Sequence, residues 1–225
     1  MGLVNDLPKL VEEYKDKIKW NTILDAGCGE GNFIRSLYDN GLVDKDSHVY
    51  GIDTSPKALI KAHRLNRETW FYQTYIETLY MIEPKELDFI SCIQVIEHVD
   101  DENECFEEFN RVLKKDGYLY LTTVFKELWA TYKYRNKYGE AVLDKGHLRE
   151  YNEVSEDKFR KIIEKNGFKI IEEKKIPLSY PIGGTIIAKF GVKYLKKKYW
   201  KPYKDISGYY LWEFILVKKE DLKNG

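Results

Sequence analysis

A turn with three glycines follows the first apolar segment of this chain and limits the folds open to it. Residues 23–33 read ILDAGCGEGNF, an apolar strand that ends in an acid and runs into Gly27, Gly29 and Gly31. Glycine adopts backbone angles that other residues avoid, and its missing Cβ lets a ligand touch the main chain. A helix that begins near Asn32 would direct free N–H groups at that ligand. The turn therefore predicts a binding site for a nucleotide-like cofactor.

The spacing of the glycines distinguishes between cofactors. The dinucleotide-binding pattern is G-x-G-x-x-G, whereas here the third glycine comes one residue early and Asn32 occupies its place. The next apolar segment, residues 48–53, ends in Asp53, near the ~20-residue offset at which a carboxylate binds a ribose diol. The spacing argues against NAD and assigns Asp53 to a ribose.

Four segments in this order resemble the class I S-adenosylmethionine-dependent methyltransferases. The family's first motif, D-x-G-x-G-x-G, matches residues 25–31, and its second strand ends in an acid, as here at Asp53. Residues 87–99 are similar to its fourth strand with an E-H ending, and residues 111–121 to the helix and fifth strand that follow. The resemblance covers residues 20–125 and implies S-adenosyl-L-methionine as the cofactor and a Rossmann-like fold. A glycine turn alone would also suit another class of nucleotide-binding Rossmann domain.

Hydrophobic periodicity predicts strands that alternate with helices, and thus an α/β, doubly wound, mostly parallel sheet. The resemblance completes it as a seven-stranded sheet with an antiparallel last strand. Ligands bind such sheets at the carboxyl ends of the strands. The predicted elements include a helix at residues 8–20, a helix capped by Thr54-Ser55-Pro56 that runs through about Arg67, a strand at 70–73, a helix with Phe106, Phe109 and Leu113 buried, and strands at 167–176 and 208–218.

Composition suits one domain spanning residues 1–225. The chain has 225 residues, 43% of them hydrophobic, which is enough for a full core. Lys+Arg and Asp+Glu are 37 each, so no overall basic charge attracts nucleic acid. Three cysteines do not form a disulfide framework, and we expect a cytoplasmic protein without a signal peptide, myristoyl site or membrane span. The excess of lysine, glutamate, isoleucine and tyrosine is typical of a hyperthermophile, although a low-GC genome gives a similar bias.

The resemblance implies cofactor contacts at the first two strands. Asp25 and the main chain around Gly27 and Gly29 would lie near the methionine half of the cofactor, with Asp53 on the ribose. Cys28 is interpreted as a small turn residue rather than a reactive thiol, because nothing nearby in the sequence would lower its pKa.

Further contacts are implied at the third and fourth strands. Tyr75 and Ile76 would lie beside the adenine; many family members carry an acid where Tyr75 stands, so adenine recognition here would rest on the backbone or on stacking. Ile93 and Gln94 would face the sulfonium. The complete set of predicted cofactor residues is Asp25, Gly27, Cys28, Gly29, Gly31, Phe33, Asp53, Thr54, Tyr75, Ile76, Ile93 and Gln94.

Two of the four histidines, His98 and His147, fall where the methyl-transfer site is expected. The protein must align the nucleophile and remove its proton, and an imidazole with a pKa near ~6.5 is suited to that task. His98 follows the fourth strand, where it serves equally well as a contact within the E-H motif. His147 ends a long connection, residues 126–150, that would roof the pocket. Both are predicted catalytic residues.

The same residues suggest a metal site. Relatives among the quinone-ring and small-RNA 2′-O-methyltransferases place E-x-x-E-H and a distant histidine around a divalent metal. Here Gln94 replaces the first acid, which keeps an oxygen donor but loses Coulomb attraction, and leaves Glu97, His98 and His147 as ligands. The plain E-H motif also occurs in metal-free members, and that interpretation is the stronger one.

Two segments outside the cofactor half combine aromatic residues with cations. Residues 127–138 suit stacking on a sugar, quinone or base, or packing of a helix on the core. Residues 185–204, within a predicted insertion at 179–207, hold seven lysines and no acid. They predict peripheral contact with an anionic partner, either a phosphorylated or lipid-linked substrate, a membrane surface or RNA; the alternative is a solvated helix face.

The function expected from this sequence is O-methylation of a small molecule, glycan or lipid-linked intermediate. Amino-group enzymes acting on nucleic acid show an Asn/Asp-Pro-Pro-aromatic motif after the fourth strand, where this chain reads QVIE, and no Pro-Cys nucleophile is present. RNA 2′-O-methylation with a divalent metal remains the alternative. A cofactor-binding protein without catalysis is a third interpretation.

Overall fold

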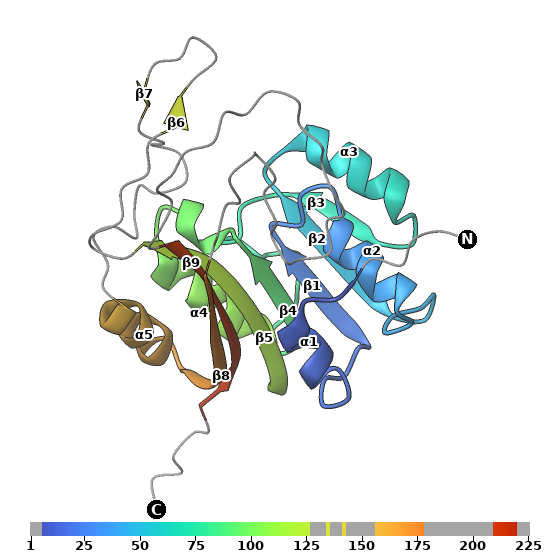
Figure 1. Cartoon of the computed structure of the whole chain (residues 1–225). Helices are drawn as coiled ribbons and strands as arrows, with labels where there is room; N and C mark the ends of the chain where they lie inside the picture. The colour runs from blue at the N-terminus through green and yellow to red at the C-terminus, as the bar shows by residue number, and fades with distance from the viewer. Residues whose placement is uncertain (1–5, 127–133, 136–140, 143–155, 178–208, 220–225) are drawn as a thin grey trace, which may run out of the picture.

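The computed structural model describes residues 6–126, 134–135, 141–142, 156–177 and 209–219. Within them an open seven-stranded sheet separates two layers of helices (Figure 1). In spatial order its strands are β3 (Trp70–Gln73), β2 (His48–Asp53), β1 (Thr22–Ala26), β4 (Leu87–Ile93), β5 (Leu113–Lys126), β9 (Tyr209–Lys218) and β8 (Phe168–Pro177).

The direction of the strands confirms the predicted sheet. Neighbours from β3 to β5 pair in parallel, whereas β9 runs antiparallel to both β5 and β8. Strands 70–73, 167–176 and 208–218 were placed correctly to within a residue. A separate pairing joins β6 (Tyr134–Arg135) to β7 (Ala141–Val142).

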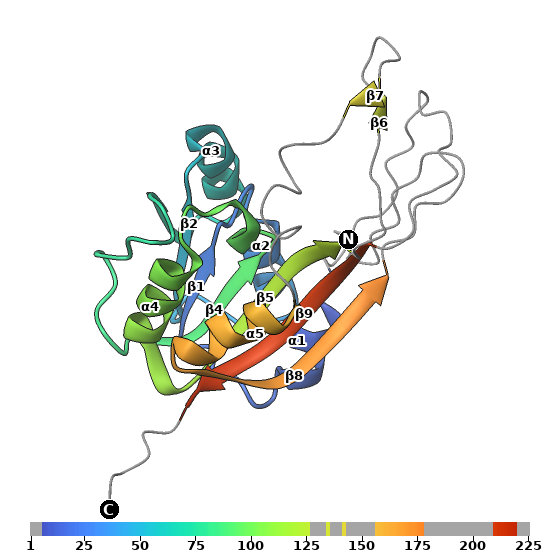
Figure 2. The same cartoon turned by 90° about the vertical axis from the view of Figure 1, so that its left-hand side faces the viewer.

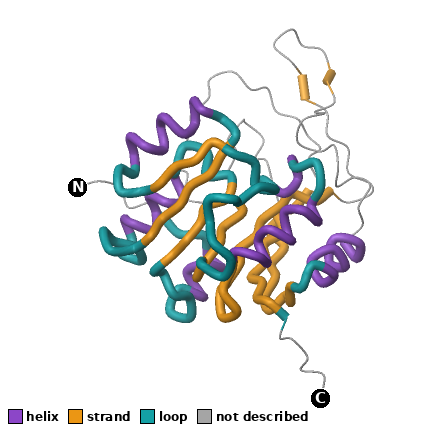
Figure 3. The backbone as a smooth tube through the Cα atoms, turned by 180° about the vertical axis from the view of Figure 1, so that it is seen from behind, coloured by secondary structure: helices purple, strands orange, loops and turns teal. Residues whose placement is uncertain are grey.

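Helices cover both faces of the sheet (Figure 2). α1 (Lys9–Tyr14) and α2 (Asn32–Asp39) pack on one face, and α4 (Glu102–Val112) and α5 (Glu156–Lys165) on the other. α3 (Pro56–Leu65) follows β2, and the short 3-10 helix η1 (Ile96–His98) follows β4. Helices and strands alternate along the first half of the chain, and Figure 3 shows from behind how helices lie beside the strands of the sheet.

Alternation along each strand builds a core on both sides of the sheet. Ile23 and Phe89 join the cluster under α1 and α2, while their neighbours Leu24 and Ile90 join the cluster under α4. Successive side chains of a strand point to opposite faces, so parallel strands covered on both sides are apolar almost throughout. Phe106 and Phe109 of the predicted helical stripe are buried in α4. The assignment of Leu113 to this helix is wrong: its backbone is extended, with φ −72° and ψ 140°, and it is the first residue of β5, although it is buried as predicted.

The helix predicted at residues 8–20 is wrong in length, because α1 ends at Tyr14. The Trp20 indole donates to the carbonyl of Lys15 at 2.9 Å, taking an acceptor that a continuing helix would use. Leu10, Val11 and Ile18 are nevertheless buried, as the periodicity predicts.

The predicted start of the helix after β2 is confirmed. Ser55 accepts a hydrogen bond from the Ala58 amide at 3.3 Å, and Pro56 is the first helical residue. The helix ends at Leu65 because Asn66 leaves helical geometry, with φ −132° and ψ 83°.

The predicted roof at 126–150 lies outside the described residues except for Lys126 and the β6–β7 pair, and the insertion at 179–207 lies wholly outside them. No helix in the described part of the chain has the length and hydrophobicity that a membrane span requires.

Candidate active site

The turn between β1 and α2 has the backbone geometry that its glycines predict. Gly27, Gly29 and Gly31 have φ of 78°, 52° and 77°. The amides of Gly27 and Cys28 donate to the Ile52 carbonyl at 2.9 and 2.8 Å, which ties the turn to β2. A Cβ at Gly27 would lie 2.2 Å from a methyl of Val95, whereas one at Gly29 would meet no atom within 4 Å. Gly27 is therefore required by packing, and Gly29 leaves its main chain open to a ligand.

Asp25 lies near the end of β1 and is buried. Its Oδ1 accepts a hydrogen bond at 2.8 Å from the Ser91 hydroxyl, on the paired position of β4. Burial raises the pKa of Asp25 to about 7, although the hydrogen bond from Ser91 acts in the opposite direction. A cationic ligand beside this carboxyl would favour its ionised form. Asp25 is thus suited to a positively charged group.

Asp53, at the end of β2, joins the glycine turn to α3. Its Oδ2 accepts from the Gly29 amide at 2.9 Å, and its Oδ1 accepts from the Ser55 amide at 2.8 Å. These two bonds hold the carboxylate in one orientation. Each oxygen keeps another lone pair, so hydroxyl donors of a ribose can still bind.

Gln94 follows β4 in a strained conformation. Its φ is 54°, which is uncommon outside glycine. The backbone N–H of Gln94 donates to the carbonyl oxygen of Thr122 at 3.0 Å and to the hydroxyl oxygen of Thr122 at 3.1 Å. Thr122 is fully buried on β5 and pairs with Ile93. The two strands therefore fix the direction in which the chain leaves β4, with the Gln94 side chain exposed at the carboxyl edge. Strained residues of this kind cluster at functional sites.

The predicted adenine residues follow β3. Tyr75 is 67% exposed, so its ring is accessible for stacking, whereas the next residue, Ile76, is buried. Thr54 is exposed, and its carbonyl accepts from the Gln73 side chain at 3.3 Å, which links the ends of β2 and β3.

Two residues of the predicted set have clear structural tasks. The Phe33 ring packs on the sheet, with its centroid 6.4 Å from that of Phe89 and 6.5 Å from that of Tyr120. Cys28 is buried, and burial raises the pKa of its thiol, which supports a turn residue over a reactive thiolate. Contact of either residue with a cofactor stays a prediction.

The two residues of the E-H motif, Glu97 and His98, differ in their exposure to solvent. Glu97 is buried, its Oε2 has no hydrogen-bond partner in the described part of the chain, and burial raises its pKa to about 7. His98 is exposed. Across residues 6–126, 156–177 and 209–219 no three His, Cys, Asp or Glu residues form a group that could hold a metal ion. His147 lies outside the described residues, so its role and the site with Glu97 and His98 stay predictions.

Four residues that support the site were missed from the sequence. Ser91 and Thr122 act across strand pairs, Val95 packs over Gly27, and Asn66 donates its Nδ2 to the Gly31 carbonyl at 2.9 Å. Each contact depends on how distant segments pair, and only the position of Ser91 in a predicted strand offered a signal.

The fold and the glycine turn are those of the class I S-adenosylmethionine-dependent methyltransferases. A family model described as a methyltransferase domain matches residues 4–173, and the chain belongs to that family. The family is one of methyltransferases, which are transferases. The open main chain at Gly29 and the fixed carboxylate of Asp53 fit S-adenosylmethionine.

Known relatives agree with this assignment. The ubiquinone biosynthesis O-methyltransferase of Nitrosomonas europaea is 28% identical over 118 residues, 51% of this chain and 48% of that protein. The chain spans about half the length of the curated relatives it matches.

Solved structures share the fold over nearly the whole chain. A SAM-dependent methyltransferase from Methanosarcina mazei has a TM-score of 0.64 at 20% identity, covering 96% of this chain and 100% of that one. The 1,6-didemethyltoxoflavin-N1-methyltransferase of Burkholderia thailandensis, solved with S-adenosylhomocysteine, has a TM-score of 0.57 at 14% identity, covering 94% and 76%.

Proposed function

We propose that this methyltransferase acts on an oxygen atom of a small molecule, a glycan or a lipid-linked intermediate. The observation that carries the proposal is the match of about half the chain to ubiquinone biosynthesis O-methyltransferases, which are O-methylating enzymes by name. The QVIE sequence after β4 is also unlike the motif of nucleic-acid amino-group enzymes. A cytoplasmic setting is part of the proposal, supported by three free cysteines.

Cofactor binding is assigned to the carboxyl edge of β1, β2 and β4. When bound, S-adenosylmethionine supplies a methyl group activated by its sulfonium. The buried Asp25 would complement positive charge on the methionine half, and the main chain at Gly27 and Gly29 would approach the ligand closely. Asp53 would hold the ribose hydroxyls through its remaining lone pairs.

The remaining contacts complete this assignment. Tyr75 and Ile76 would bind the adenine, the first by stacking its exposed ring. Ile93 and Gln94 would border the reacting centre. Both are held at the carboxyl edge by Thr122 of β5, which pairs with Ile93 and accepts a hydrogen bond from the backbone amide of Gln94.

The acceptor hydroxyl must lose a proton, and His147 or His98 would accept it. His98 is exposed at the end of η1, the 3-10 helix that follows β4 and Gln94. A neutral imidazole serves as a general base at neutral pH. The lysines of residues 185–204 would hold an anionic group of the substrate or a membrane surface.

Incubation with methyl-labelled S-adenosylmethionine tests the acceptor class. Purified protein is offered catechols, prenylated phenols, saccharides and total RNA in parallel, and products are separated and analysed by mass spectrometry. We expect a methyl ether on a hydroxyl-bearing small molecule or lipid. Methylated RNA alone would favour 2′-O-methylation of RNA, and methylation confined to nitrogen would refute the proposal.

A vesicle assay tests the lysine segment separately. Changing Lys193, Lys196, Lys197 and Lys198 to glutamine should remove up to ~4 kcal/mol of attraction to anionic vesicles, since each lysine near such a surface contributes ~1 kcal/mol. Cofactor affinity should not change. If wild type binds neither anionic vesicles nor RNA across a salt series, the segment is a solvated face.

A further inference from the structure

The connection between β3 and β4, residues 74–86, carries the residues assigned to the adenine. It is described throughout and contains neither helix nor strand. At its start the Thr74 hydroxyl donates to the Thr78 carbonyl at 3.3 Å, and the Thr78 amide donates to the Tyr75 carbonyl at 3.1 Å. This turn sets the position of Tyr75. Because an irregular segment has few hydrogen bonds of its own, contacts from other elements must fix the rest of the connection.

Arg111, in the last turn of α4, binds this connection at two carbonyl groups. Its Nη1 donates to the Ile82 carbonyl at 2.9 Å, and its Nη2 donates to the Leu79 carbonyl at 2.8 Å. Glu108, one turn earlier in α4, holds the same guanidinium, accepting from Nε at 2.7 Å and from Nη2 at 2.8 Å. Paired bonds of this kind fix the plane of an arginine side chain. The guanidinium is therefore directed at the connection.

Glu108 binds the connection as well. Its Oε2 accepts from the Leu79 amide at 2.8 Å. The hydrogen bonds from Arg111 lower the pKa of Glu108, so the carboxylate is ionised at neutral pH and its bond to the amide is charge-assisted. The Leu79 side chain is buried in the core cluster that also contains Phe106 of α4. One ion pair thus holds both the N–H and the C=O of Leu79, the residue that follows the turn at 74–78.

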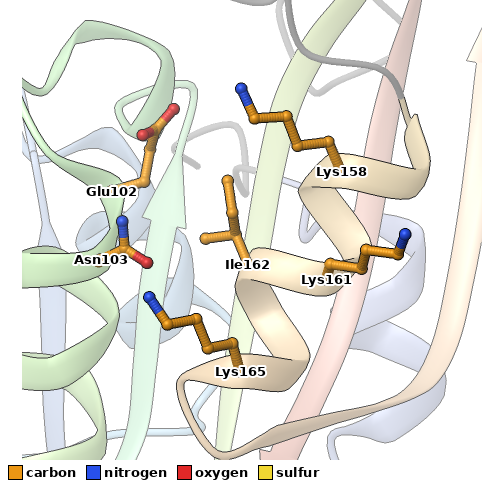
Figure 4. A pocket seen from close by; sticks show the side chains of 6 residues that line it. All are labelled: Glu102, Asn103, Lys158, Lys161, Ile162 and Lys165. Carbon is orange, nitrogen blue, oxygen red and sulfur yellow. The ribbon is translucent and has the colours of Figure 1, made fainter.

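Another side of α4 is anchored to α5. The side-chain amide of Asn166, just after α5, donates to Asn103 Oδ1 at 3.1 Å. Beside this contact lies a cavity of about 320 Å³, lined by Glu102, Asn103, Ile162 and three lysines of α5 (Figure 4). Those lysines are exposed, and lysines on a solvent-facing helix do not by themselves make a site. What this side of α4 provides is a fixed support for Arg111 and Glu108.

We propose that Arg111 and Glu108 are positioning residues for cofactor binding, because they hold Leu79 and thereby the turn that presents Tyr75 to the adenine. The proposal rests on the proposed assignment of the adenine to Tyr75 and Ile76. The apparent affinity of a ligand falls in proportion to the fraction of protein molecules in the binding-competent conformation. By keeping residues 74–86 in one conformation, the ion pair keeps that fraction high without touching the ligand.

Hydrogen exchange tests the positioning directly. In R111Q the amides of Thr78 and Leu79 should exchange at least ~10-fold faster, because each lost charge-assisted bond stabilises the closed segment by about that factor. R160Q is the matched control. Arg160 of α5 also binds a glutamate through two nitrogens, its side chain is 31% exposed against 32% for Arg111, and its partner Glu173 lies on β8. R160Q should leave exchange at residues 74–86 unchanged.

A double-mutant cycle with S-adenosylhomocysteine gives a second measurement, which a general loss of stability would not reproduce. Y75A should weaken binding at least ~5-fold, since stacking of a base on an aromatic ring contributes that much or more. R111Q should also weaken it at least ~5-fold through the reduced competent fraction, and R111K, which keeps the charge but not the planar fork, should lose less. Because Arg111 acts through the turn at Tyr75, R111Q/Y75A should lose less than the product of the two single losses. R160Q should bind as wild type does.

The outcomes separate this proposal from the adenine assignment. Wild-type affinity in R111Q, or losses that multiply fully in R111Q/Y75A, would overturn the positioning role while the adenine assignment stands. Unchanged affinity in Y75A would remove the adenine from this turn, and the positioning role with it. E108Q, which alters the bond to the Leu79 amide, makes the same comparisons if R111Q does not fold.

Discussion

Gly29 and Gly41 offer a matched pair of substitutions that separates cofactor contact from backbone strain. Both residues lie in the left-handed region, with φ of 52° and 67°, and a Cβ at either would meet no atom within 4 Å. Alanine in this region costs ~1–2 kcal/mol, so G29A and G41A should lose similar stability. For a chain of this size that is a drop of about 2–8 °C in Tm.

Cofactor affinity should respond to only one of the two. The Cβ of G29A would occupy the open face of the turn where the ligand meets the main chain, and we expect S-adenosylhomocysteine to bind at least ~10-fold more weakly, a loss of ~1.4 kcal/mol. G41A, beyond the end of α2, should keep wild-type affinity. Isothermal titration gives the affinities and scanning calorimetry the stabilities. Equal affinity losses in the two variants, or none in G29A, would refute the placement of the cofactor on this turn.

Further predictions concern four acidic or basic side chains. Burial raises the pKa of Glu97 from 4.5 to about 7, so between these pH values the folded state retains a proton that the unfolded state releases. The free energy of unfolding should therefore fall as the pH rises from 4.5 to about 7. In denaturant titrations, E97Q should remove up to ~3 kcal/mol of this pH dependence. The ratio of the affinity for S-adenosylmethionine to that for S-adenosylhomocysteine, whose sulfur is uncharged, should rise with pH through about 7 as Asp25 ionises. D25N should abolish this rise. D53A should weaken S-adenosylhomocysteine binding by ~10- to 150-fold, the loss of a charge-assisted bond; unchanged affinity would move the ribose elsewhere. H147A should lower turnover by ~10²- to 10⁴-fold with cofactor affinity intact, and activity that survives chelation would exclude the metal role.

Local features of the sequence predicted the sheet and the turn well. Asp25 and Asp53 lie at or near the ends of strands whose apolar runs are short and sharply bounded, and the three glycines come just after the first of these strands. Their positions could therefore be derived from neighbouring residues. The Ser55 cap and Pro56 likewise marked the start of α3. These features depend on a few adjacent residues, which is why they were accessible without a structure.

Contacts between distant segments could not be derived in this way. Asp25 is held by Ser91 because β1 and β4 pair in one particular register, and nothing local specifies that register. Glu97 and His98 look equivalent in the motif, but tertiary packing buries one and exposes the other. Helix α1 was overextended because the bond from Trp20 to the Lys15 carbonyl has no signature in hydrophobic periodicity.

The pairing of β8 with β9 has a consequence for how such enzymes diverge. The register continues as far as Pro177 opposite Tyr210, so residues 178–208 enter and leave the sheet at adjacent points. Doubling the length of a flexible connection costs only ~0.6 kcal/mol, so replacements of very different length are tolerated between fixed ends. Related enzymes can therefore differ in the number of residues between these two strand ends at little cost to the stability of the sheet.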